Sequence, residues 1–202
     1  MNHREQWNTR FAGEGYVFGE TPNRFLTEQA HHLPPKATIL SVADGEGRNG
    51  VWLAEQGHHV VSIDISENGQ AKAKKLAQKR GVSLDFRIAD MADWDWPEAA
   101  FDAIVAIFIQ FADPTLRNRI FAGMQQALKP GGLLLLQGYR PEQLGYNTGG
   151  PRALENLYSE AMLRQAFADW QIDYLHSHDS QINEGAGHNG MSALIDLVAR
   201  RI

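Results

Sequence analysis

A glycine-rich segment, ADGEGRNG at residues 43–50, follows a short apolar run and precedes a predicted helix. Gly45, Gly47 and Gly50 match the G-x-G-x-x-G spacing, which lets a backbone approach a nucleotide closely. Asp64 ends the next predicted strand, where a carboxylate can accept both hydrogen bonds of a ribose diol. The segment and the acid together predict a nucleoside cofactor, although glycines at such a turn can also serve tight packing alone.

Arginine and histidine residues could carry further chemistry. Arg48 begins the helix after the glycines, where it can attract an oxyanion or pair with Glu46 or another nearby acid. His176 and His178 share one face of a predicted strand and could both bind a metal ion, but Asp179 points to the other face. Because no third ligand is implied near them, we predict no metal site.

Apolar runs alternate with helical stretches between residues 37 and 138. Several runs are continuously apolar, which is typical of parallel strands covered on both faces. The pattern predicts an α/β fold, a Rossmann-like doubly wound sheet with helices on both faces. The predicted strands lie near 37–43, 59–64, 83–88, 102–109 and 132–138, and the predicted helices near 3–12, 22–33, 47–56, 66–80 and 114–128.

The pattern changes after residue 138. We expect a turn-rich loop at 140–158, a short helix near 159–169, a strand near 171–177, a second loop at 178–190 and a last strand near 191–199. Because only a loop joins the last two strands, they should pair antiparallel. No composition break marks a second domain. We therefore expect one domain, divided into a helical lid (1–36), a cofactor-binding core (37–138) and a C-terminal part with substrate loops and a hairpin (139–202).

The composition excludes several classes of protein. The 202 residues are 43% hydrophobic and 21% charged, which suits a folded domain. A net charge of −5 argues against a nucleic-acid partner, and no stretch is apolar enough to span a membrane. The lack of cysteine excludes disulfides and thiolate chemistry. Because the N-terminal MNHREQWNTRF has no apolar signal region, we expect a cytoplasmic protein.

Three features favour S-adenosylmethionine over NAD as the cofactor. A dinucleotide needs two mononucleotide-binding halves, and no second glycine fingerprint follows the fourth predicted strand. A helical leader precedes the first strand, whereas dinucleotide domains usually open on that strand. The stretch LKPGGLLLLQG (128–138) also matches the turn before the fifth strand of class I S-adenosylmethionine-dependent methyltransferases, where Pro130 stops the helix.

Over essentially its whole length the chain resembles the class I methyltransferases, and within them the tellurite-resistance and thiopurine methyltransferase-like branch. The leader GYVFGETPNRFL resembles the lid of that branch, and GEGRNGVWLAEQGHHVVSIDIS its cofactor loop and acidic strand end. FDAIVAIFIQF resembles its fourth strand. The loop segments YNTGGP (146–151) and EGAGHNG (184–190) carry the most specific resemblance to that branch, whereas KPGG is shared by many methyltransferases.

The resemblance implies how the cofactor would be held. The backbone around Gly45 and Gly47 would hold its methionine part, and Asp64 its ribose. Ile65 would pack on the adenine, Asp90 and Met91 would contact the adenine amino edge and ring, and the main chain near Ile107 would close the methionine end. The candidate cofactor-binding residues are Asp44, Gly45, Glu46, Gly47, Asp64, Ile65, Asp90, Met91 and Ile107.

The chain departs from the family pattern near the glycine segment. Ser41 stands where the family commonly has an acid that positions the cofactor ammonium, and Ala43 stands where it has glycine. Asp44 is a possible replacement carboxylate, or else a surface loop residue. Ala43 needs only an ordinary negative φ on this interpretation, and Gly50 is a helix residue that completes the glycine spacing by chance.

Loops that converge at the carboxyl edge of the sheet should form the acceptor pocket. Its candidates are Trp7, Tyr16, Phe18, Phe108, Tyr139, Tyr146 and Glu184, with His188, Gln110 and Arg48 as candidate catalytic residues. His188 could act as a base or orient the acceptor, or simply be a loop histidine bonded to backbone. Gln110 stands where relatives often carry histidine, and an amide cannot take up a proton at neutral pH.

In-line methyl transfer to a small-molecule acceptor is the function that these features favour. The reaction needs proximity, alignment and exclusion of water, and no acid–base pair is obligatory for a soft anion or a thiolate. Two alternatives remain: a non-catalytic cofactor-binding protein whose site has drifted, suggested by Ser41, Ala43 and Gln110, and an NAD-linked oxidoreductase, suggested only by the glycine spacing.

Overall fold

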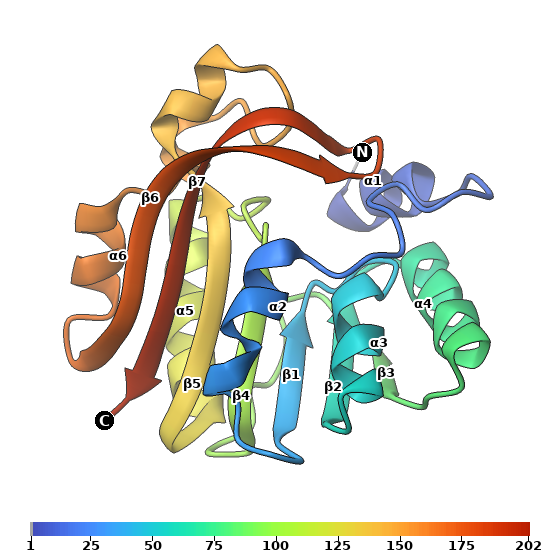
Figure 1. The fold of residues 1–202 in the computed structure, drawn as a ribbon, viewed down its shortest axis with the longest axis horizontal. Helices are drawn as coiled ribbons and strands as arrows, with labels where there is room; N and C mark the ends of the chain where they lie inside the picture. The colour runs from blue at the N-terminus through green and yellow to red at the C-terminus, as the bar shows by residue number, and fades with distance from the viewer. Residues whose placement is uncertain (1) are drawn as a thin grey trace.

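A computed structural model describes residues 2–202. Among these residues seven strands form one sheet, in the order β3-β2-β1-β4-β5-β7-β6 (Figure 1). The first five strands pair in parallel, whereas β7 runs antiparallel to both β5 and β6. The strands are β1 (Thr38–Val42), β2 (His59–Asp64), β3 (Asp85–Ile88), β4 (Phe101–Ile107), β5 (Leu128–Tyr139), β6 (Trp170–Glu184) and β7 (His188–Arg201). The predicted α/β fold class is confirmed.

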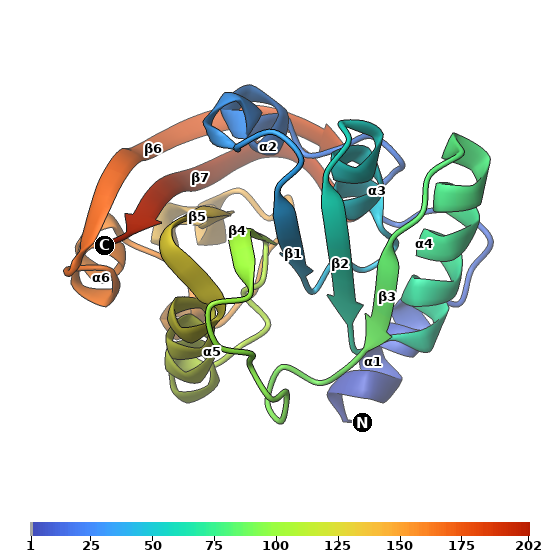
Figure 2. The same cartoon turned by 90° about the horizontal axis from the view of Figure 1, so that it is seen from below.

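Helices cover both faces of this sheet, as expected. In Figure 2, α2 and α3 lie on one face and α5 lies on the other. Phe25, Leu26 and Leu53 pack on the first face, and Ile120 and Met124 on the second. The helices are α1 (His3–Arg10), α2 (Arg24–Gln29), α3 (Arg48–Glu55), α4 (Glu67–Arg80), α5 (Pro114–Ala127) and α6 (Glu160–Ala166), with 3-10 turns η1 (Ala30–His32), η2 (Pro141–Gly145) and η3 (Leu154–Asn156).

Local sequence signals explain where the core helices begin and end. The Ser66 side chain accepts a hydrogen bond from the Gly69 N–H and so caps the start of α4. Gly81 ends the same helix at a φ of 72°, which glycine adopts without strain. Asp113 caps α5, and Pro114 occupies its first turn. None of the helices among residues 2–202 is long and apolar enough to cross a membrane.

The C-terminal hairpin is longer than the sequence predicted. The loop expected at 178–190 is wrong, because β6 and β7 stay paired up to Glu184 and His188 and turn only at residues 185–187. β6 is the edge strand of the sheet, and many of its side chains are exposed or only half-buried. The polar stretch HSHDSQINE therefore has a loop-like composition although its backbone is fully extended.

Candidate functional site

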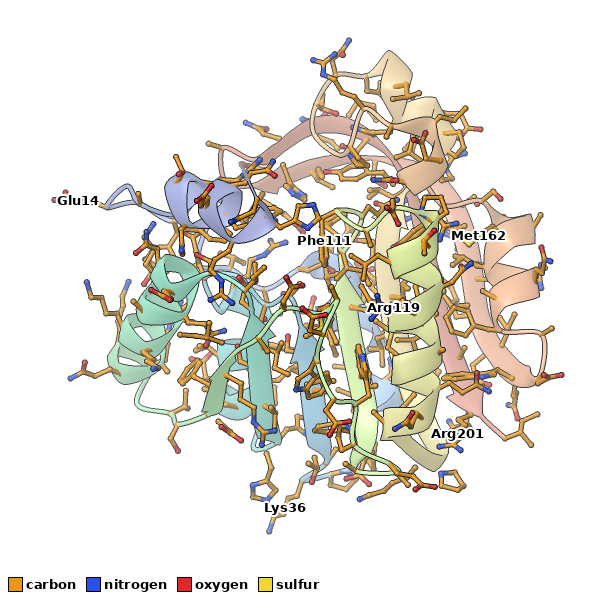
Figure 3. All side chains as sticks on the ribbon, turned by 180° about the vertical axis from the view of Figure 1, so that it is seen from behind. Glu14, Lys36, Phe111, Arg119, Met162 and Arg201 are labelled. Carbon is orange, nitrogen blue, oxygen red and sulfur yellow. The ribbon has the colours of Figure 1, made fainter. Side chains whose placement is uncertain are left out.

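A cavity lies at the carboxyl edge of β1, β2 and β4. Helix α1 passes over this edge, and Figure 3 shows Phe111 beside it, where the Phe111 ring meets the edge of His3. A ligand site at the carboxyl ends of parallel strands is the rule for open α/β sheets. The cavity gathers many of the predicted residues: Trp7, Phe18, Asp44, Gly45, Arg48, Asp64, Ile65, Asp90, Met91, Ile107, Phe108 and His188.

Several residues that line the cavity were not among the predicted site residues. They are His3, Phe11, Ala43, Asn49, Ala89 and Phe111. His3, Trp7 and Phe11 lie four residues apart, so they fall on one face of α1, and the Trp7 and Phe11 rings stack with centroids 5.4 Å apart. This spacing is the signal that could have identified His3 and Phe11 from the sequence.

The turn from β1 into α3 uses three left-handed residues. Ala43, Gly45 and Gly47 have φ values of 49°, 58° and 86°. The negative φ expected for Ala43 is therefore wrong, and a non-glycine residue in this conformation costs about 1–2 kcal/mol. The turn lets the Asp44 N–H donate to the Ile63 carbonyl at 2.9 Å, which continues the pairing of β1 with β2.

The Asp44 carboxylate is buried in a cage of donors. It accepts hydrogen bonds from the Ser41 hydroxyl at 2.7 Å, the Ser62 hydroxyl at 2.8 Å and the Gly50 N–H at 3.1 Å. Burial raises the pKa of Asp44, although these three bonds oppose the shift. The acid thus lies within hydrogen-bonding distance of Ser41, the position where the family resemblance expects one.

Gly50 has a specific role in this cage. A Cβ atom at Gly50 would lie 2.3 Å from Asp44 Oδ2, too close for any side chain. The interpretation of Gly50 as a chance match is therefore wrong, because the close approach of Asp44 to α3 requires a glycine there. Gly47 serves packing instead: its Cβ would lie 2.5 Å from the Ala73 Cβ of α4, and it does not line the cavity.

Asp64 ends β2 with its carboxylate at the cavity. Its two oxygens accept hydrogen bonds from the Gly45 N–H and the Ser66 N–H, both at 2.8 Å. Burial raises the pKa of Asp64 to about 6 despite these bonds. Each oxygen keeps a further lone pair, so the group can still accept hydrogen bonds from a diol.

Glu46 anchors the segment that follows α1 rather than lining the cavity. Its Oε2 accepts hydrogen bonds from the Val17 and Phe18 N–H groups at 2.7 and 3.4 Å, and its Oε1 pairs with Lys72 at 2.8 Å. Tyr16 donates to the Lys72 carbonyl at 3.1 Å and also lies outside the cavity. This buried carboxylate holds residues 16–18, and with them the Phe18 ring, over the site.

His188 lies among three aromatic rings. The Phe18 and Phe108 rings meet it edge-on, with centroids 4.5 and 4.4 Å away, and the Tyr139 hydroxyl is 3.0 Å from His188 Nδ1. Burial, followed by the charges of Arg48 and Arg10, lowers the pKa of His188 to about 3. The imidazole is therefore neutral at physiological pH, which suits an orienting hydrogen bond better than proton abstraction.

Arg48 is buried with only part of its guanidinium satisfied. Its Nη2 donates to Glu184 Oε2 at 2.7 Å, and the pair is almost fully shielded from solvent. Glu184 also accepts from Asn23 Nδ2 at 2.9 Å. Arg48 Nη1 is buried without a hydrogen-bond partner among residues 2–202, beside the cavity that Arg48 lines. A buried donor left free in this way can bind an anion.

The remaining predicted pocket residues lie behind or outside the cavity. Within residues 2–202 the Gln110 side chain bonds only to backbone groups: it donates to the carbonyls of Tyr139 and Asn156 and accepts from the Tyr139 N–H. Tyr139 stacks on Phe108 and reaches the site only through His188. Tyr146 is exposed and donates to Asp179 at 2.9 Å.

Sequence comparison matches the central part of the chain. A family model described as "Methyltransferase domain" matches residues 39–132. The chain is 31% identical over 127 residues to a tRNA 5-carboxymethoxyuridine methyltransferase of Escherichia coli, covering 60% of this chain and 46% of that protein. It is 30% identical over 136 residues to phosphoethanolamine N-methyltransferase 1 of Arabidopsis thaliana, covering 64% and 27%. The chain thus spans less than half the length of these curated relatives.

Solved structures share the fold over nearly the whole chain. A structure from work on the conversion of a disulfide bond into a thioacetal group during echinomycin biosynthesis matches with a TM-score of 0.78 and 19% identity, covering 99% of this chain and 92% of that one. TehB from Haemophilus influenzae matches with a TM-score of 0.72 and 17% identity, covering 98% and 67%. At these identities the likeness concerns the fold alone.

Proposed function

We propose, from the premise that residues 39–132 form a class I S-adenosylmethionine-dependent methyltransferase domain, that this chain transfers a methyl group to a small anionic acceptor. The observation that carries the proposal is the cavity itself. Asp64 and the glycine turn line one part of it, and the unsatisfied Arg48 guanidinium and neutral His188 line another. One cavity therefore combines groups suited to a nucleoside with groups suited to an anion.

The residues of this cavity fit S-adenosylmethionine. Gly45, at a φ of 58°, lines the cavity at the turn, and Asp64 offers its remaining lone pairs to a ribose diol. Ile65 and Met91 provide apolar surface for an adenine, with the Asp90 carboxyl beside them. Asp44 is the candidate carboxylate for the cofactor ammonium, because it lines the same cavity within hydrogen-bonding distance of Ser41.

The chain's own residues would supply binding, alignment and exclusion of water. When bound, S-adenosylmethionine supplies a methyl group on a sulfonium, which is already activated for in-line displacement. Phe18 and Phe108 cover the acceptor side and keep water out, and neutral His188 offers its second ring nitrogen as a hydrogen-bond partner. Holding the reactants at the reaction distance accounts for about 7–11 kcal/mol of a barrier, so no general base is required.

Charge supports a small anion as the acceptor. Arg48 lines the cavity and keeps one buried donor, Nη1, without a partner among residues 2–202, and the Arg10 guanidinium lies 5.1 Å from the centroid of the Phe18 ring. Both cations act on His188, whose pKa they help to lower. A negatively charged acceptor would be attracted by the two arginines and would satisfy the Arg48 donor.

We further place the chain in the tellurite-resistance and thiopurine methyltransferase-like branch, as a single domain of lid, core and C-terminal part. The support lies in the two loop segments that led to this prediction. The Asn189 N–H donates to the Thr148 carbonyl at 3.4 Å, and the Gly187 N–H donates to the Val17 carbonyl at 3.0 Å. EGAGHNG thus contacts both YNTGGP and the leader, and its His188 lines the cavity.

Calorimetric titration with S-adenosylmethionine, S-adenosylhomocysteine and NAD tests the cofactor. We expect both sulfur nucleosides to bind with a stoichiometry of one and NAD not to bind. Binding of NAD without either sulfur nucleoside would overturn the proposal. The acceptor is tested by a methylation panel of tellurite, selenite, halides, thiols and thiopurines. Turnover of an anionic member supports the anionic class, whereas turnover of neutral members alone contradicts it.

A further inference from the structure

Two histidines and an aspartate meet on the C-terminal hairpin, away from the cavity described above. His176 and His178 come from β6, and Asp196 lies on β7, directly opposite His176 in the antiparallel register. One potential ligand atom from each residue lies within 4.8 Å of the other two. The two imidazoles stack with centroids 4.9 Å apart and an interplanar angle of 10°.

Hydrogen bonds already orient two of these three side chains. His178 Nδ1 lies 2.8 Å from the Ser180 hydroxyl, which leaves His178 Nε2 facing Asp196 Oδ2 at 3.0 Å. The other oxygen of Asp196 accepts a hydrogen bond from Gln137 Nε2 at 2.6 Å. Metal ligands in proteins are typically held in this way, with the second ring nitrogen or second oxygen bonded to a neighbour.

On its buried side, the cluster is connected to a series of hydrogen-bonded polar side chains. Gln137 accepts from Asn23 Nδ2 at 2.7 Å, and Asn23 also donates to Glu184, the ion-pair partner of Arg48. Asp196 is 5% exposed, so its carboxylate is fixed by packing as well as by hydrogen bonds. The chain of bonds makes Asp196 a rigid ligand rather than a mobile surface acid.

The other side of the cluster opens to a cavity. The three residues line this cavity together with Arg24 and Glu28 of α2. Figure 2 shows α2 facing the inner side of the β6–β7 hairpin. His176 itself is exposed. A metal ion held by the three side chains would therefore keep a coordination position open to water.

We propose that His176, His178 and Asp196 form a binding site for a divalent transition-metal ion of the zinc type. Two imidazoles and one carboxylate are a ligand set that zinc and its neighbours accept, with water in the fourth position. Zinc–nitrogen and zinc–oxygen distances of about 2.0–2.2 Å place tetrahedral ligands roughly 3.4 Å apart. The three ligand atoms, which now lie within 4.8 Å of one another, would have to approach to that spacing when the metal binds.

Zinc titration of the full chain tests the site. The protein is freed of any histidine tag and treated with a chelator, and Zn²⁺ is added in competition with a chromophoric chelator. We expect one equivalent to bind, and His176→Gln and His178→Gln each to weaken the affinity at least about 100-fold. The matched control is His31→Gln/His32→Gln, which removes a histidine pair with ring centroids 4.2 Å apart. This control should keep the wild-type affinity.

Cobalt gives an independent readout of the same site. Co²⁺ bound by two imidazoles and a carboxylate should produce visible absorption bands that His176→Gln abolishes. His176 is exposed, so its replacement tests the ligand even if His178→Gln lowers stability. The proposal is overturned if wild-type protein binds less than one equivalent of Zn²⁺ at micromolar concentration. It is equally overturned if the His176→Gln variant binds as tightly as the wild type.

Discussion

Asp64 shows how burial prepares a single side chain for a ligand. The two backbone N–H donors favour its charged form, yet desolvation outweighs them and raises its pKa to about 6. The free protein therefore holds Asp64 partly protonated in mildly acidic solution. A diol that donates hydrogen bonds selects the ionised form.

Cofactor affinity should therefore depend on pH through Asp64. Below pH 6 the free enzyme takes up a proton that binding must release, so the Kd for S-adenosylhomocysteine should rise by up to about tenfold per pH unit. Calorimetry between pH 5 and pH 8 measures this slope. Asp64→Asn should bind weakly with a flat profile, whereas Asp85→Asn, a change on the exposed part of β3, should keep the wild-type slope.

Asp44 should contribute to cofactor binding as a carboxylate. We expect Asp44→Asn to raise the Kd for S-adenosylmethionine about tenfold or more, as for the loss of a charge-assisted hydrogen bond. Ser62→Ala is the control, because it removes one donor to Asp44 and leaves the carboxylate in place. If Asp44→Asn binds as tightly as Ser62→Ala, the carboxylate has only a structural role.

Gly50 should tolerate no side chain. Gly50→Ala sets a methyl group 2.3 Å from Asp44 Oδ2 and must displace the buried carboxylate or helix α3. We expect it to lower the free energy of unfolding by about 1–3 kcal/mol, measured by urea denaturation. Gly13→Ala should stay near the wild-type value, because no atom lies within 4 Å of a Cβ built there. Equal stability of the two variants would contradict the packing argument.

At the scale of elements, the tip of the hairpin and the segment after α1 hold each other in place. A Cβ at Gly185 would lie 2.4 Å from the Val17 carbonyl oxygen, and one at Gly187 would lie 2.3 Å from the Phe18 ring. The Gly187 N–H donates to the Val17 carbonyl. Glycine at this tip allows the two backbones to touch, and this contact positions Phe18 and His188 together.

Gly187→Ala should loosen this contact. The added methyl group pushes the Phe18 ring away from His188, so we expect weaker cofactor binding and faster proteolysis near residues 12–20. Limited chymotrypsin digestion, which cleaves after aromatic residues such as Tyr16 and Phe18, and calorimetry measure the two effects. Gly145→Ala, where a Cβ meets nothing within 4 Å, is the matched control. Unchanged digestion of Gly187→Ala would show that the contact does not hold the segment.

At the scale of the whole molecule, the folded chain keeps a neutral histidine inside a site with two nearby arginines. The unfolded chain can protonate His188 at its ordinary pKa of 6.5, whereas the folded chain protonates it only near pH 3. The unfolded state thus binds more protons between these values. The contribution of the neutral His188 to the free energy of unfolding is therefore fully present above pH 6.5 and is lost as the pH falls toward 3.

His188→Gln should remove that pH dependence. The difference in unfolding free energy between wild type and variant should change by up to about 1.4 kcal/mol per pH unit in this window, with the wild type losing more on acidification. Asp64 has the opposite effect: because its pKa is raised from 3.8 to about 6 on folding, it stabilises the folded state as the pH falls between these values. Comparing the two proteins by urea denaturation cancels this contribution, and a constant difference would contradict the assignment.

The sequence alone determined much of the frame and predicted many of the residues that line the cavity. Continuous apolar runs, helix caps and glycines act over a few residues, so they predicted the parallel core of the sheet. They also predicted the position of Asp64, because the end of one strand lies beside the next in a parallel sheet. Polar edge strands carry no such signal, and the length of the hairpin was missed for that reason.

Contacts between distant segments were decided by the tertiary structure. Glu46 accepts a hydrogen bond from the Val17 N–H, and Glu184 pairs with Arg48. Asp196 lies beside the two histidines of β6 because the register of β6 and β7 places it opposite His176. Local periodicity cannot encode such a register, which depends on the free energy of the whole packed sheet. Asp44 and Gly50 are only six residues apart, but their interdependence showed only in three dimensions, because the turn before helix α3 brings the Asp44 carboxylate back against Gly50 in that helix.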